Sequence, residues 1–178
     1  MKIFVFQLLF FVFVGSVTAQ ATEEQLLKQH VRETIHVEHL QLTSKAGDDE
    51  DSVFYGASLA WFIDDRWFWG GSAYGSALGK RGGFFIGGFR FGGHWRIASK
   101  SSIDVSVTLG GGGGGAADQG DGLFIRPEIS FGYRFGSSWE VSVHTAHMRF
   151  RNSNINSPVF GCGLSYHYMR LFGAAGDH

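Results

Sequence analysis

The chain has 178 residues, among them 27 glycines, 18 phenylalanines and five tryptophans, and its net charge at pH 7 is −1. A nearly neutral chain has no global electrostatic attraction for nucleic acid or for an acidic substrate, so neither is predicted as a partner. The single cysteine, Cys162, excludes an internal disulfide.

The first residues, 1–19, predict a cleaved secretory signal peptide. Lys2 precedes an apolar run at 3–14, and Val17, Thr18 and Ala19 form a small-residue cleavage site. Residues 20–34 are polar and are expected to be a leader, either flexible or a short helix. No later segment has the uninterrupted apolar length of a transmembrane helix.

Residues 35–172 predict β-strands, and 173–178 a short tail. The eight strands are expected at residues 35–44, 53–62, 67–77, 83–97, 102–110, 123–135, 139–148 and 160–168. Side chains alternate across a strand, and in 123–135 every odd position is apolar while the even positions are charged, small or Phe124. Such long alternation is unusual for a soluble strand but suits one that crosses a bilayer at a tilt. In the first strand the alternation slips near His39.

The connections between these strands alternate in length. Short turns at 63–66, 98–101 and 136–138 separate longer connections at 45–52, 78–82, 110–121 and 149–158. Outer-membrane barrels have this pattern, with tight periplasmic turns and longer external loops. The tryptophans all lie next to short turns and predict a girdle at the periplasmic membrane interface: Trp61, Trp67, Trp69, Trp95 and Trp139.

These patterns predict an all-β fold, an eight-stranded antiparallel up-and-down transmembrane β-barrel in the bacterial outer membrane, in contact with its lipid. Closure is expected because an open sheet edge cannot face hydrocarbon. The six glycines from Gly110 to Gly115 lack the ending of a phosphate-binding loop and are expected in a mobile surface loop. The sequence does not indicate an oligomeric state.

Eight strands enclose a space that side chains alone can fill. The non-apolar strand faces predict an interior ion-pair network of Arg90, Arg96, Asp104, Arg126, Glu128, Arg134 and Glu140, with His94 and His144 beside it. Both signs of charge occur in this set, as buried charges require. A conducting pore or a polar ligand pocket is the alternative. The histidines do not have metal-ligand spacing, so neither a metal nor another cofactor is predicted.

The last predicted strand carries Gly163, Tyr166 and Tyr168, a glycine followed by aromatics three and five residues later. This pattern resembles the C-terminal signal by which outer-membrane barrels are recognised for insertion. The resemblance implies the barrel-insertion machinery as a partner. Gly161 stands where that signal usually has a polar residue, and the chain continues for ten residues beyond Tyr168.

The last 45 residues or so resemble the closing strands of the outer-membrane lipid A deacylases, on the segments 131–136 and 139–143 and on His147. That family implies a lipid-facing His/Ser/Glu triad whose histidine and serine are two residues apart. His147 has the outward parity, but Arg149 stands at the serine position and Ser153 lies six residues away. A nucleophile needs its base within hydrogen-bonding reach, so the resemblance supports the barrel and argues against catalysis.

Three functions follow from this sequence. The first is a non-enzymatic outer-membrane barrel with a filled interior and a structural, adhesive or envelope-protective role carried by its acidic and glycine-rich loops. The second is a deacylase-like hydrolase with His147 as base and Ser153 or Ser157 as nucleophile. The third is a soluble secreted lipocalin-like barrel, with the phenylalanine-rich face turned inward around a ligand.

Overall fold

The computed structural model describes residues 27–43, 49–78, 82–115 and 117–172. The predicted signal peptide, residues 20–26 of the leader and the tail at 173–178 lie outside these residues. The described part of the chain contains no helix that is long and apolar enough to cross a membrane. Residues Lys28–Arg170 form one compact unit, which is the subject of the following description.

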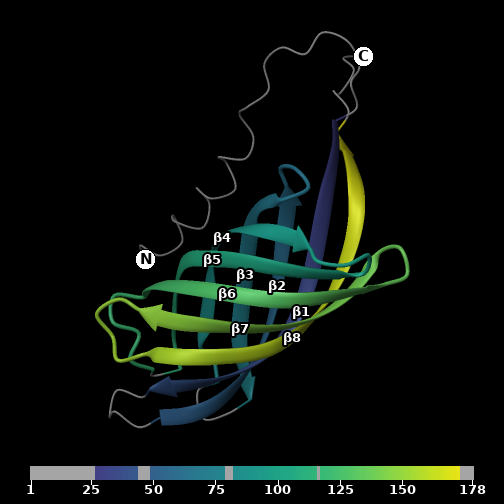
Figure 1. Ribbon diagram of the computed structural model, residues 1–178. Helices are drawn as coiled ribbons and strands as arrows, with labels where there is room; N and C mark the ends of the chain where they lie inside the picture. The colour runs from purple at the N-terminus through teal and green to yellow at the C-terminus, as the bar shows by residue number, and fades with distance from the viewer. Residues whose placement is uncertain (1–26, 44–48, 79–81, 116, 173–178) are drawn as a thin grey trace, which may run out of the picture. The chain divides into compact units, whose positions relative to one another are not determined.

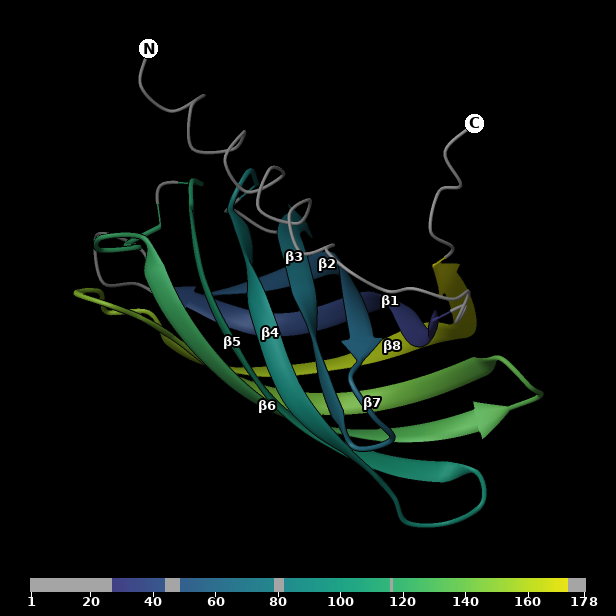
Figure 2. The ribbon, with the colours of Figure 1, turned by 90° about the horizontal axis from the view of Figure 1, so that it is seen from above.

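Eight antiparallel strands form this unit, and each strand pairs with the next one in the chain (Figure 1). They are β1 (Leu27–Thr43), β2 (Asp49–Phe62), β3 (Trp67–Leu78), β4 (Phe85–Arg96), β5 (Ser101–Gly113), β6 (Leu123–Phe135), β7 (Trp139–Phe150) and β8 (Asn156–Phe172). The sheet is a closed barrel, and Figure 2 shows the strands curving round a common interior. The predicted fold class is therefore confirmed. We call the two ends of the barrel the turn end and the loop end, after their short and long connections.

The first strand is longer than the sequence predicts. β1 begins at Leu27 rather than at residue 35, so residues 27–34 are not a leader. From Arg32 onward the side chains alternate, with Arg32 and Thr34 buried and Glu33 exposed. The slip near His39 has a physical cause: the inward positions continue as Leu40 and Leu42, because the interior at the loop end is apolar.

The glycine run is also structured differently from the expectation. Gly110–Gly113 belong to β5 rather than to a loop, and they pair with Phe85–Gly88 of β4. A Cβ atom on Gly110 would collide with the backbone of Gly87 and Gly88. Glycine is required there because the two backbones approach too closely for a side chain.

The outer surface of the barrel is apolar. Exposed large hydrophobic side chains occur on all eight strands, and Phe85, Phe89 and Phe91 are 56%, 43% and 42% exposed. Conversely, Arg90 and Arg126 are buried inside. The hypothesis of a soluble calyx is therefore wrong, since it requires the phenylalanines inside and the arginines in water.

The interior has three layers. A polar and charged layer occupies the middle, and at the turn end Ala60, Phe62 and Phe68 form a small apolar cluster. At the loop end lies a larger cluster, the apolar plug, formed by Leu40, Leu42, Phe54, Tyr74, Phe84, Ile86, Ala117, Phe124, Ala146, Met148, Phe150, Ile155 and Val159. The non-apolar inner face predicted from the sequence is therefore confined to part of the barrel length.

Two connections at the loop end are joined in what we call the loop cap, residues 114–115, 117–122 and 151–155. Asn154 donates its backbone and side-chain N–H groups to Oδ2 of Asp118, and Asn152 donates to Oδ2 of Asp121. Ser153 donates to the backbone oxygen of Asp118. Ala117 and Ile155 are fully buried beneath these contacts, so the cap also covers the plug.

Candidate functional site

The polar layer of the interior contains two linked groups of charges. In the first, Arg126 donates to Oε1 of Glu38 at 2.6 Å and to Oε2 of Glu128 at 3.0 Å. Arg90 donates to the other oxygen of Glu128 at 2.6 Å. Nε2 of His144 lies 2.9 Å from Oε1 of Glu38. Each carboxylate therefore has a cationic partner, which offsets the cost of burying its charge.

The second group lies nearer the turn end. Arg32 donates to Oδ2 of Asp104 at 2.5 Å, and its other terminal nitrogen lies 3.6 Å from Glu140. Nδ1 of His94 is 2.7 Å from the second oxygen of Asp104. The ring of Phe68 lies 5.2 Å from the Arg32 guanidinium and 5.3 Å from that of Arg90, so it separates the two groups of charges.

Of the seven residues that the sequence assigns to an interior network, five are buried in these two groups: Arg90, Asp104, Arg126, Glu128 and Glu140. The other two are placed differently. Arg134 is half-buried at the turn end, with Nη2 3.2 Å from Nδ1 of His167. Arg96 is exposed, which corrects the expectation, because it is the last residue of β4 and lies where the barrel opens to solvent.

Sequence reasoning missed the contribution of β1. Arg32, His36 and Glu38 are 4%, 3% and 2% exposed, and Arg32 and Glu38 complete the two groups of charges. Arg32 was missed because the strand was expected to begin at residue 35. His36 and Glu38 lie inside the predicted strand, but the slip in its alternation near His39 hid its inward face.

The donor atoms of His36, Glu38 and His144 lie within 4.8 Å of one another, a spacing from which a metal ion could be bound. However, the guanidinium of Arg126 already occupies Oε1 of Glu38. A metal ion would be held beside this cation, without further negative charge to balance it. We therefore assign the three residues to the hydrogen-bond network.

The polar layer leaves little free space. The cavity among its residues, which include Arg32, His36, Glu128 and His144, measures about 10 Å³. That volume holds about one water molecule and is far too small for a file of water or a solute. The geometry favours a filled barrel over a pore.

The tryptophans lie on the outer surface near the turn end. Trp61 and Trp69 face each other across β2 and β3, with ring centroids 4.8 Å apart, and Trp67 lies 6.3 Å from Trp95. Trp139 lies 5.0 Å from Tyr166 of β8. Tyr168 donates to Glu33 at 2.8 Å, and Gly163 is buried. The membrane girdle and the insertion signal stay predictions.

The catalytic candidates do not form a triad. His147 is exposed on the outer surface, where its Nε2 lies 2.6 Å from Oδ1 of Asn156 rather than from a serine. Ser153 belongs to the loop cap, where its hydroxyl contacts Asp118 and accepts from the backbone N–H of Ile155. Ser157 is 3% exposed and points inward, where it donates to the backbone oxygen of Gln41. Neither serine is activated by His147 in this arrangement.

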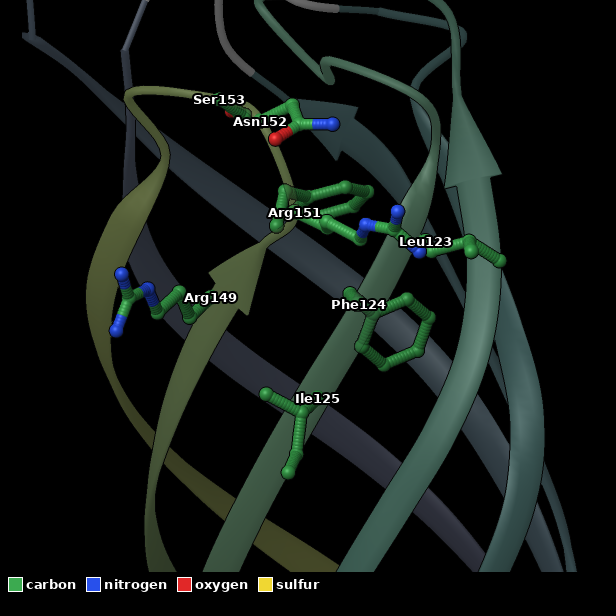
Figure 3. Close-up of a pocket in the computed structure, with 8 residues that line it drawn as sticks. Leu123, Phe124, Ile125, Arg149, Arg151, Asn152 and Ser153 are labelled. Carbon is green, nitrogen blue, oxygen red and sulfur yellow. The ribbon is translucent and has the colours of Figure 1, made fainter.

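A groove of about 630 Å³ opens between β6 and β7 at the loop end (Figure 3). Its walls are formed by Leu123, Phe124, Ile125, Arg149, Phe150, Arg151, Asn152 and Ser153. Below it, the β6–β7 pairing runs from Ile125↔Arg149 directly to Glu128↔Ala146. Pro127 lies in this interruption and has no N–H group to donate to β7, which explains a local loss of pairing.

No protein-family model matches the chain, and no curated protein matches its sequence. Solved structures do match. The Yersinia pestis attachment invasion locus protein Ail, in complex with the heparin analogue sucrose octasulfate, has a TM-score of 0.57 at 10% identity, covering 80% of this chain and 100% of that one. Neisserial surface protein A has a TM-score of 0.53 at 12% identity, covering 78% of this chain and 96% of that one. A de novo designed transmembrane β-barrel has a TM-score of 0.53 at 9% identity, covering 83% of this chain and 100% of that one.

Similarity at these identities shows the fold, which is that of small transmembrane β-barrels. The apolar outer surface is an independent physical observation that agrees with it, because a closed barrel with this surface belongs in hydrocarbon. The chain is an eight-stranded β-barrel of the outer-membrane type.

Proposed function

We propose that the protein is a non-enzymatic outer-membrane barrel with a closed interior, and that it presents the loop cap at the cell surface. The observation that carries this proposal is the combination of an apolar exterior with an interior filled by paired charges and the apolar plug. Such a barrel is a rigid scaffold that neither conducts nor encloses a ligand. The part that would project beyond the membrane is the surface formed by its loops.

The barrel part of the proposal is tested by gel mobility of protein from outer-membrane fractions, with and without boiling. A closed barrel has no free edge from which to unfold, so it resists detergent until it is heated. We expect a mobility shift in membrane-pelleted protein and background conductance in planar bilayers. A soluble protein without a shift would contradict the membrane location, and stepwise channels would contradict the filled interior.

A role in attachment is supported by the order of the loop cap, in which two connections are joined by Asp118 and Asp121. The fold is shared with an attachment protein and a surface protein, although shared fold alone does not carry function. The sulfated ligand of the Yersinia protein is not carried over, because a shared fold at 10% identity does not transfer a binding site.

Attachment is tested with cells that display the protein, measured on an epithelial cell layer. Changing Asn152 and Asn154 to alanine removes two of the side-chain bonds that join the two connections, those to Asp121 and Asp118, and we expect attachment to fall toward that of cells without the protein. The matched control is Arg96→Gln at the opposite end, which should attach like wild type. Equal attachment by cells with and without the protein would refute the adhesive role.

Lipid A mass tests the absence of catalysis. Because His147 contacts Asn156 and neither candidate serine, we expect the lipid A of cells expressing the protein to keep its full set of acyl chains. Loss of one acyl chain in these cells, abolished by His147→Ala, would establish a deacylase instead.

A further inference from the structure

We propose that the groove between β6 and β7 binds one phosphorylated lipid of the outer leaflet, with its acyl part against Leu123 and Ile125 and its phosphate groups at Arg151, in the groove, and at Arg149, on the other side of β7. This inference rests on the proposed membrane location. It names a ligand class and a site that the scaffold role does not require.

The apolar wall of the groove faces outward. Leu123 and Ile125 are 50% and 46% exposed and lie near the loop-end limit of the apolar outer surface. Burying such side chains against acyl chains removes apolar area from water or headgroups. The wall belongs to the outer leaflet if the long connections are external.

The cationic rim of the groove lies just beyond this wall. The side chain of Arg151 reaches across the gap toward β6, whereas that of Arg149 extends on the other side of β7 (Figure 3). Arg151 is 69% exposed, and only its Nε lies near a carboxylate, that of Asp121 at 3.2 Å. Its terminal nitrogens lie outside that ion pair, and Arg149 has no carboxylate partner among the residues that the structure describes.

Charge and depth together specify the ligand. Guanidinium groups bind phosphate through charge-assisted hydrogen bonds, and these are stronger at the edge of hydrocarbon than in bulk water. A free phosphate would leave the apolar wall unused, and a zwitterionic lipid would leave the rim charges partly unbalanced. A phosphorylated lipid satisfies both surfaces, and lipid A is the probe of this class.

The test is native mass spectrometry of the full-length protein in a neutral detergent, titrated with bisphosphorylated lipid A. We expect one bound lipid, with affinity reduced about tenfold by Arg151→Gln or Arg149→Gln and about a hundredfold by both changes. Arg151→Lys should retain most of the binding because it keeps the charge. The matched control, Arg66→Gln with Arg96→Gln, removes two exposed cations near the turn end and should bind like wild type.

Two further arms separate the parts of the site. Ile125→Ser should weaken lipid A binding, and dephosphorylated lipid A should bind less tightly to the wild type. Equal affinity of wild type and the double Arg149/Arg151 variant would overturn the proposal, and so would displacement by inorganic phosphate at the lipid's own concentration. Each sample is first checked for the heat-dependent mobility shift. Loss of that shift in wild type contradicts the membrane barrel, whereas a normal shift without selective binding contradicts only the lipid site.

Discussion

Arg126 is the most constrained charge in the barrel. Its side chain is 1% exposed, it donates to Glu38 and Glu128, and its guanidinium lies 4.4 Å from the centre of the Tyr74 ring. We expect Arg126→Met to lower the free energy of unfolding by about 3–5 kcal/mol, because two buried carboxylates lose a cation. Denaturant unfolding in detergent micelles measures this.

The control for Arg126 separates charge from volume. Adding Glu38→Gln to Arg126→Met should recover part of the lost stability, because Glu128 keeps Arg90 as its partner and no carboxylate is then buried without a cation. Arg96→Met, a change at an exposed arginine, should alter stability by less than about 0.5 kcal/mol. Similar small effects at both arginines would show that the interior pairs do not stabilise the barrel.

Asp64 organises the turn between β2 and β3. Its Oδ1 accepts hydrogen bonds from the backbone N–H groups of Trp67 at 2.6 Å and Arg66 at 2.7 Å. These bonds hold the pKa of the Asp64 carboxyl below its ordinary value. A lowered pKa in the folded state stabilises the protein above the unfolded pKa of about 3.9, and this stabilisation is lost as the pH falls through the lowered value.

Asp64→Ala should therefore be less stable than wild type at pH 7, and the difference should shrink as the pH falls below about 4. Unfolding midpoints of both proteins at neutral and acidic pH measure this. A difference that stays constant with pH would mean that the side chain acts through packing and not through its charge. Asp65→Ala, at the neighbouring exposed carboxyl of the same turn, is the matched control.

At the scale of elements, the strands change the chemistry of their inner face along their length. Large inward side chains lie beside glycines of neighbouring strands. A Cβ on Gly56 would collide with the Tyr74 ring, and one on Gly132 would lie 2.8 Å from the Glu140 carboxyl carbon. Small residues on one strand make room for large ones on the next. The layers therefore arise from cross-strand complementarity and not from any one strand.

The apolar plug yields an element-scale prediction. Phe84 and Phe150 meet at a centroid distance of 5.8 Å and are each 1% exposed. We expect Phe84→Ala or Phe150→Ala to cost about 3–5 kcal/mol of unfolding free energy through the cavity left behind. Conductance in planar bilayers should nevertheless stay at background, because the cavity among the residues of the polar layer below measures only about 10 Å³. Channel openings in either variant would show that the plug alone closes the barrel.

What the sequence predicts at this scale depends on repetition. The outward face was predictable because its apolar side chains recur every second residue, and this pattern does not depend on which neighbours they contact. The inward face was predictable only as a direction. Parity places Glu128 inside, on the same face as Arg126 two residues earlier in β6, but its pairing with Arg90 depends on the register of β4, β5 and β6. His36 and Leu40 share one inward face of β1, and the change from polar to apolar between them disguised the alternation.

For the whole molecule, closure joins the two ends of the described chain. The hydroxyl oxygens of Thr34 in β1 and Ser165 in β8 are 2.9 Å apart, and the hydroxyl of Tyr168 in β8 donates a hydrogen bond to Glu33. In Figure 1 the purple β1 and the yellow β8 run side by side. Residues 28–34, which the sequence assigns to a leader, are thus part of the seam that closes the barrel.

Deleting residues 28–34 tests this directly. If they were a leader, the barrel would remain intact. If they form half of the seam, deleting them leaves β8 with an unpaired edge. The deletion also removes Arg32, so Asp104 loses its guanidinium partner. Because an open edge cannot be satisfied in hydrocarbon, we expect the deletion to abolish the heat-dependent mobility shift. Thr34→Ala is the control, since it removes one hydroxyl contact and keeps the backbone pairing, and it should retain the shift. A normal shift in the deletion variant would show that the barrel closes without the first part of β1.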